Sequence, residues 1–286
     1  MLRAFTFYLL SLCLMPLATA EQHLDAYQLI TLVSNPDLRP SFGGDGSSYL
    51  SGGIGILVYD GATAMDALGP YQVFSNAGLK PFLISASKND KGKYKLNLTL
   101  TGQLKITADR TIANTKDLEV LVIAGGETET LKIARDKKVI DWIKAIDKKT
   151  IYTTSVCNGL WILGATGLLK GKNATGNWYR ADELITHFGA IPQLQKRYVF
   201  DGKIVTASGN TAGIDMALAI VKKVFTGDLN DGKDYTQGVM LDLQYDPHPP
   251  VAGGSIEKTE PAVYNALQEL YDYFSLADSV KALPIQ

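Results

Sequence analysis

The sequence contains few of the residues on which metal and disulfide proteins depend. It has 2 cysteines and 3 histidines in 286 residues. The histidines, His23, His187 and His248, are scattered, so no ligand-spacing motif predicts a metal site. Cys13 lies in the N-terminal apolar run, which leaves Cys157 without an intramolecular disulfide partner once that run is removed. We therefore expect no metal and no cofactor.

An excess of charge of one sign is also absent. Lys and Arg number 28 against 29 Asp and Glu, which gives a formal net charge of −1. This balance provides no basic surface for nucleic acid or for an anionic membrane. The apolar content of 46% is typical of folded proteins, and the length suits one large α/β domain with short additions. We expect a small-molecule substrate and no nucleic acid partner.

A long apolar run is found only at the N-terminus. Residues 4–17 follow Arg3, and residues 18–20 match a small-x-small cleavage site, which predicts a signal peptide over residues 1–20 and a periplasmic or secreted protein. The run is short for a transmembrane helix, so we expect no stable membrane anchor after cleavage; an uncleaved anchor is the alternative. Residues 21–53 are predicted to form an N-terminal extension and a linker rich in Gly, Ser, Pro and Asp.

Strands and helices alternate from residue 54 onward. The apolar runs 55–59 and 118–124 are typical of strands covered on both faces, and the alternation with helices predicts an α/β fold, a mostly parallel sheet sandwiched between helices. Ligands bind such sheets at the carboxyl ends of the strands. The other predicted elements are strands at 81–85 and 149–154, two short strands within 198–207 around Asp201 and Gly202, a hairpin at 93–106, and helices at 65–77, 178–188 and 212–225.

The most informative segment surrounds Cys157. A predicted strand runs into this cysteine, and Gly159 and an apolar helical pattern follow at once, which is typical of a nucleophile elbow. A thiol at the start of a helix is expected to favour the thiolate. The alternative is that Cys157 is a small buried hydrophobic residue, because free cysteine is among the most buried residue types.

Several segments together resemble the ThiJ/PfpI family of the class I glutamine-amidotransferase-like superfamily, which implies a flavodoxin-like fold. The resemblance covers residues 54–255 and is carried by residues 55–69, 123–126, 155–159 and 164–175. Further motifs are similar to the isocyanide hydratase branch and to the ligand-sensing domains of AraC-type regulators. They lie at residues 189–192, 211–215 and 245–250.

The family resemblance implies roles for particular residues. Cys157 matches the family nucleophile, and Asp66 matches the hydratase carboxylate that handles protons beside the thiol. The alternative for Asp66 is an acid that only stabilises a helix N-terminus. Gly125 and Gly126 end a buried strand and are expected either to line an anion hole or simply to form a tight turn.

Two departures from the family pattern narrow the function. Asn158 stands where hydratases carry threonine and where the protease-like branch carries histidine, and Asn177 replaces a histidine of the hydratase and regulator branches. A Cys-His dyad at this position is therefore absent. We assign Asn158 and Asn177 to substrate binding. The substitutions are consistent either with an altered specificity or with lost catalysis.

The segment 256–286 is predicted to form a C-terminal helical tail. Val263, Leu267, Leu270 and Tyr271 recur at helical spacing, which predicts a helix that docks onto its own domain or onto a partner subunit. Because the family is typically dimeric, the resemblance implies a homodimer.

The sequence therefore predicts an exported cysteine-dependent enzyme, with hydration of a small electrophile such as an isocyanide as the leading reaction. Cys157 would attack the carbon, and Asp66 would act as acid and base. The alternative is a non-catalytic periplasmic ligand-binding or thiol redox-sensing module of the same fold. A thiol pKa well below about 8.5 favours the enzyme, and an unperturbed or inaccessible thiol favours the module.

Overall fold

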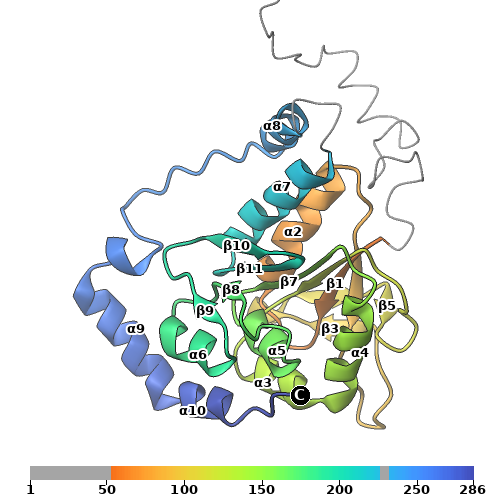
Figure 1. Cartoon of the computed structure of the whole chain (residues 1–286), viewed down its shortest axis with the longest axis horizontal. Coiled ribbons are helices and arrows are strands. Elements are labelled where there is room, and N and C mark those ends of the chain that lie inside the picture. Colours follow the sequence, from red (N-terminus) through yellow and green to blue (C-terminus); the bar gives the residue numbers. More distant parts are fainter. Residues whose placement is uncertain (1–52, 226–231) are drawn as a thin grey trace, which may run out of the picture.

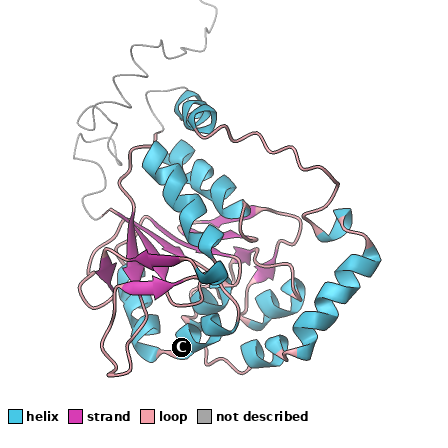
Figure 2. Ribbon diagram, turned by 180° about the vertical axis from the view of Figure 1, so that it is seen from behind, coloured by secondary structure: helices cyan, strands magenta, loops and turns pink. Residues whose placement is uncertain are grey.

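The computed structural model describes residues 53–225 and 232–286. The predicted signal peptide and almost all of the predicted extension and linker lie outside these ranges. Within them, a central sheet separates two layers of helices (Figure 1; Figure 2), which confirms the predicted α/β class.

The central sheet has seven strands and is mostly parallel. Six of its strands run in the same direction, and only β10 is antiparallel to its neighbour β11. The order across the sheet is β10 (Tyr198–Asp201), β11 (Ile204–Ala207), β7 (Tyr152–Val156), β6 (Val120–Ile123), β1 (Ile54–Val58), β2 (Phe82–Ser85) and β5 (Arg110–Thr111).

The apolar runs of the sequence form the centre of this sheet. Every residue of β1 and of β6 is buried, because helices cover both faces of these strands. One face carries α2 (Ala64–Asn76), α7 (Ala212–Val224) and α8 (Lys233–Asp242), and the other carries α3 (Thr128–Arg135), α4 (Lys137–Asp147) and α5 (Gly159–Ala165) (Figure 1).

Two small sheets lie outside the central one. The predicted hairpin is present as β3 (Asn97–Thr99) paired antiparallel with β4 (Lys105–Thr107), and Gly102 has a φ of 69° at its turn. The second small sheet pairs β8 (Asn173–Ala174) with β9 (Ile191–Pro192) in parallel.

The helix predicted over residues 178–188 is shorter in the structure. It forms α6, Ala181–His187. Arg180 precedes it with a φ of 43°, a left-handed conformation that is not compatible with an α-helix. Trp178 and Tyr179 therefore lie in the loop before α6, although their apolar character made them look like part of its buried face.

The tail returns to the domain through a long, largely irregular connection that follows α8 (Figure 1). The tail contains α9 (Pro261–Tyr273) and α10 (Leu276–Lys281). Tyr264 and Tyr271 are the half-buried apolar residues of α9, whereas Val263, Leu267 and Leu270, at the spacing seen in the sequence, are exposed. No helix in the described ranges is long and apolar enough to cross a bilayer.

Candidate active site

The order of the strands brings three loops together at one edge of the sheet. The strand β1 lies between β2 and β6, so the chain leaves β1 toward one side and later returns on the other. Such a switch in direction opens a crevice at the carboxyl ends of the strands. The segments that follow β1, β6 and β7 carry Asp66, Gly125 and Cys157.

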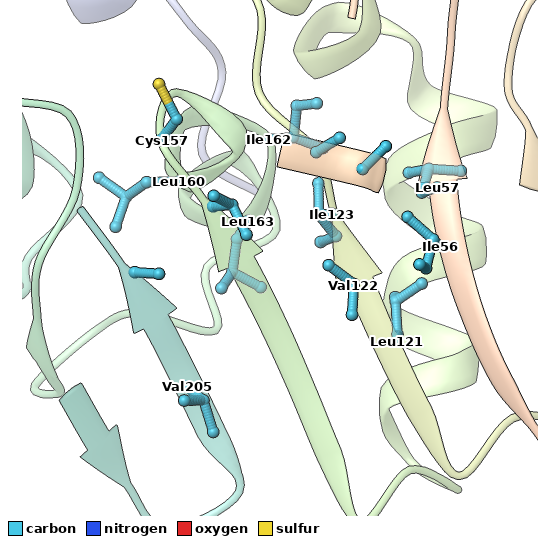
Figure 3. Close-up of a cluster of buried hydrophobic side chains, with 14 of the residues drawn as sticks. Ile56, Leu57, Leu121, Val122, Ile123, Cys157, Leu160, Ile162, Leu163 and Val205 are labelled. Carbon is cyan, nitrogen blue, oxygen red and sulfur yellow. The ribbon is translucent and has the colours of Figure 1, made fainter. Parts of the chain in front are cut away.

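Cys157 occupies a strained elbow between β7 and α5. Its φ is 58°, an unusual value for a residue other than glycine. Its backbone N–H donates to the carbonyl of Ala207 on the neighbouring strand at 3.0 Å, which fixes the turn against the sheet. The sulfur points away from the apolar side chains below it (Figure 3). The elbow predicted from the sequence is therefore formed.

Gly159 makes this elbow sterically feasible. A Cβ at this position would lie 2.3 Å from the carbonyl oxygen of Ile123, the last residue of β6. Because that contact is far inside van der Waals distance, only glycine lets α5 begin against the end of β6. The glycine therefore places Cys157 over the ends of two neighbouring strands.

Asp66 is fully buried in the first turn of α2. Its carboxylate accepts the backbone N–H of Gly125 at 3.1 Å and that of Asn210 at 2.9 Å. Burial raises the pKa of Asp66 to about 6, and the two N–H donors only partly oppose this effect. Asp66 is therefore able to gain or lose a proton near neutral pH, as an acid–base group requires.

The thiol of Cys157 interacts directly with this carboxyl. Burial raises the pKa of Cys157, and the negative charge of Asp66 raises it further. Hydrogen bonds from the side chain of Asn177, with Nδ2 at 3.2 Å from Sγ, and from the backbone of Asn158 oppose this only in part. The pKa of the thiol is thus shifted in the direction opposite to the one expected at a helix terminus, and the neutral thiol is the favoured form, because the sulfur is buried beside a carboxylate.

Gly125 and Gly126 hold the carboxyl and the elbow together. The N–H of Gly125 is used by Asp66, and a Cβ on Gly125 would lie 2.7 Å both from Asp66 Oδ2 and from the backbone nitrogen of Asn158. The carbonyl of Gly126 accepts a hydrogen bond from Asn158 Nδ2 at 2.7 Å. Asn158 Oδ1 is buried and has no hydrogen-bond partner among the described residues.

All the residues that the sequence assigned to the site lie around the thiol, but the structure adds others. Gly209 lies against Sγ, where an added Cβ would be 3.5 Å from the sulfur, and Asn210 donates to Asp66. The motif at residues 211–215, noted for its family resemblance, directly follows them and was the available signal. Tyr271 of α9 also lies near enough to Cys157 to interact with it electrostatically, and no sequence pattern linked it to the site.

His187 and His248, the two histidines within the described residues, lie apart from this arrangement, and His23 lies outside those residues. His187 ends α6, and the exposed ring of His248 contacts the carbonyl of Asp246 in the connection to the tail. Across residues 53–225 and 232–286, no three His, Cys, Asp or Glu side chains are grouped to hold a metal ion. Asp66 is the titratable group that the described residues place beside the thiol.

The mostly parallel sheet between two layers of helices, with Cys157 at a strand-to-helix elbow and the Asp66 carboxyl beside it, places the chain among the α/β proteins that carry a nucleophile elbow. The chain belongs to the DJ-1/PfpI family, whose sequence model matches residues 53–223.

Relatives of known name agree with this assignment. The chain is 34% identical over 210 residues to the isonitrile hydratase of Pseudomonas putida, covering 73% of this chain and 86% of that protein. It is 25% identical over 118 residues to the transcriptional regulator CdhR of Pseudomonas aeruginosa, covering 41% of this chain and 34% of that protein.

Solved structures show the same fold. A ThiJ/PfpI family protein from Pseudomonas syringae superimposes with a TM-score of 0.71 at 32% identity, covering 87% of this chain and 98% of that chain. DJ-1 from Schizosaccharomyces pombe superimposes with a TM-score of 0.57 at 17% identity, covering 68% of this chain and all of that chain (100%). The second match concerns the fold alone.

Proposed function

We propose that this protein is an exported, cysteine-dependent hydratase that converts an isocyanide to an N-substituted formamide. The observation that carries the proposal is the buried pair of Cys157 and Asp66, held together by Gly125. The similarity to an isonitrile hydratase over most of the chain supports this reaction. Export is supported by the signal-peptide pattern of residues 1–20.

The first half of the reaction forms a thioimidate. The Cys157 sulfur bonds to the terminal carbon of the isocyanide while the thiol proton passes to the Asp66 carboxylate, and the same proton then passes to that carbon. Because the thiol rests in its neutral form, the carboxylate has to accept the proton as the bond forms. The pKa of Asp66, about 6, suits both transfers near neutral pH.

The second half releases the product. Water adds to the thioimidate carbon, one of its protons reaches the nitrogen through Asp66, and the carbon–sulfur bond then breaks. The hydroxyl proton returns to the sulfur by the same carboxyl, which leaves R–NH–CHO and the original thiol. The unpartnered acceptor Asn158 Oδ1 is suited to hold the attacking water or the N–H that forms.

A formamide assay tests the reaction. We expect the wild-type protein to produce N-benzylformamide from benzyl isocyanide, and Cys157→Ala and Asp66→Asn to lose at least about 100-fold in kcat/KM, the range typical of an acid–base group. Asp90→Asn, an exposed carboxylate, is the matched control and should retain full activity. Intact-mass measurement should detect a thioimidate adduct on the wild type and none on Cys157→Ala. No formamide from any of several isocyanides would refute the reaction.

A second candidate function is a non-catalytic ligand-binding module. The raised pKa of the buried Cys157 thiol is the observation that favours it, because a resting thiolate is absent. The similarity to the regulator CdhR is consistent with such a module. Under this function, isocyanides and formamides would bind without turnover, and Cys157→Ala would bind them as well as the wild type does.

A further inference from the structure

The C-terminal tail supplies aromatic rings to the region of the thiol. Tyr264 and Tyr271 of α9 contact Trp178, with ring centroids 5.8 and 5.3 Å apart. Tyr271 also lies 5.1 Å from the ring of Tyr179. The helix that carries these tyrosines runs along the outside of the domain next to α6 (Figure 1). We call the rings of Trp178, Tyr264 and Tyr271 the aromatic wall.

This wall adjoins the sulfur. Trp178 directly follows Asn177, whose amide lies 3.2 Å from Sγ. Tyr271 is half-buried, burial raises its pKa, and Glu127 and Cys157 are near enough to interact with it electrostatically. Trp178 therefore links Tyr271 to the region of the thiol, because its ring contacts Tyr271 and its backbone directly follows Asn177. A substituent on a carbon bound to Cys157 therefore has an aromatic surface available beside it.

Hydrogen bonds of Arg180 and Tyr179 to Asp272, which together we call the clasp, hold α9 in place beside the aromatic wall. Arg180 binds Asp272 with two hydrogen bonds, Nε to Oδ1 at 2.8 Å and Nη2 to Oδ2 at 2.9 Å. Tyr179 donates its hydroxyl to the same carboxylate at 2.7 Å. Paired bonds from a guanidinium fix orientation as well as distance. Since Asp272 adjoins Tyr271, the clasp fixes the position of that ring.

The residues that follow α9 are anchored as well. Leu276, Ala277, Val280 and Leu283 are buried against the domain, and Lys281 forms an ion pair with Glu183 of α6 at 2.7 Å. The tail is thus fastened on both sides of the clasp. These contacts hold the tail, and with it the aromatic wall, in a fixed position on the domain.

We propose that the aromatic wall selects substrates whose reacting carbon bears a flat, uncharged ring, and this proposal rests on the proposed hydratase function. Stacked and edge-to-face contacts with aromatic rings favour a ring over an alkyl group of one carbon. The carboxylate of Asp66 beside the thiol disfavours an anionic substituent. Benzyl and phenyl isocyanides are therefore the preferred class, and methyl isocyanide is a poor substrate.

The first test compares benzyl isocyanide with methyl isocyanide. We expect Tyr271→Ala to lower the ratio of their kcat/KM values about ten-fold, mainly through KM for the benzyl compound, as the loss of one aromatic contact predicts. Tyr271→Phe should keep the ratio. Tyr273→Ala removes an exposed ring from the same helix and should also leave it unchanged. An unchanged ratio in Tyr271→Ala, or an equal loss with both substrates, overturns the proposal.

The second test does not depend on hydration. Cys157 is alkylated with iodoacetamide or with N-benzyl-iodoacetamide, and the rate is read on the peptide that contains Cys157. We expect the benzyl reagent to be favoured by the wild type and this preference to fall about ten-fold in Tyr271→Ala. If no isocyanide is hydrated but this preference appears, the hydratase function is refuted and the selectivity of the aromatic wall is supported. If formamide forms but Tyr271→Ala changes neither ratio, the selectivity of the aromatic wall is refuted and the hydratase function is retained.

Discussion

Asp66 is expected to make the protein less stable as the pH rises from acid to neutral. Its pKa is about 6 in the folded protein against 3.8 for a solvated aspartate, because the carboxyl is buried. Between these two values the unfolded chain has released the proton and the folded protein still holds it. The folded state therefore binds more protons, and the free energy of unfolding falls as the pH increases.

The size of this effect follows from the pKa difference. At about 1.36 kcal/mol per pKa unit, a shift from 3.8 to about 6 costs about 3 kcal/mol once Asp66 is ionised in both states. About 2 kcal/mol of this cost develops between about pH 4.5 and about pH 7.5. Asp66→Asn removes the titration but also turns an amide N–H toward a backbone N–H, which costs about 1–3 kcal/mol at every pH.

Urea unfolding of the wild type and Asp66→Asn across this pH range isolates the titration. All other titratable groups contribute equally to the pH dependence of the free energy of unfolding in the two proteins. The raised pKa keeps the Cys157 thiol neutral throughout this range. The stability difference should therefore shift by about 2 kcal/mol in favour of the variant between about pH 4.5 and about pH 7.5. Asp90→Asn should show no such shift. A difference that is independent of pH, or that shifts the other way, would refute the burial argument.

Three further predictions concern activity and packing. Because Asp66 has to be ionised to accept the thiol proton, kcat/KM should rise with pH through about 6 and then level off in a pH–rate profile, and this step should vanish in Asp66→Asn. Gly125→Ala should lower the free energy of unfolding by about 1–3 kcal/mol and abolish activity, whereas Gly253→Ala, with open space around it, should do neither. Asp272→Asn should change the free energy of unfolding little but raise KM for benzyl isocyanide, because the clasp is exposed to solvent yet positions Tyr271.

The sequence was sufficient to predict the elements whose structure depends on local patterns. The apolar runs that became β1 and β6 and the strand–cysteine–glycine order at Cys157 specify a buried parallel sheet and its elbow. The family resemblance then supplied Asp66 as the partner of the thiol. These features are encoded in neighbouring residues or in a motif, so no contact between distant segments was needed to find them.

The features that the sequence did not reveal depend on long-range contacts. The neutral state of the thiol follows from burial beside Asp66, which lies 91 positions away along the chain. Tyr271 reaches the crevice only because the tail folds back across α6. The helical spacing of Val263, Leu267, Leu270 and Tyr271 predicted a helix correctly. Of these four residues only Tyr271 packs against the domain, and Tyr264 packs beside it, whereas the other three are exposed.

The protonation state of the Cys157 thiol determines whether Cys157 can react without Asp66. A thiolate nucleophile would be reactive toward any electrophile, whereas a buried neutral thiol reacts only when a base accepts its proton. Under the proposed function the base is the Asp66 carboxylate, whose pKa is raised by burial to about 6, whereas burial raises the pKa of the Cys157 thiol well above that, so the thiol keeps its proton until a substrate is attacked. Reactivity is then confined to substrates that displace water from the crevice and bring their carbon to the sulfur. An aromatic wall supplied by the tail is therefore expected to control the rate of reaction at Cys157 as well as the affinity for the substrate.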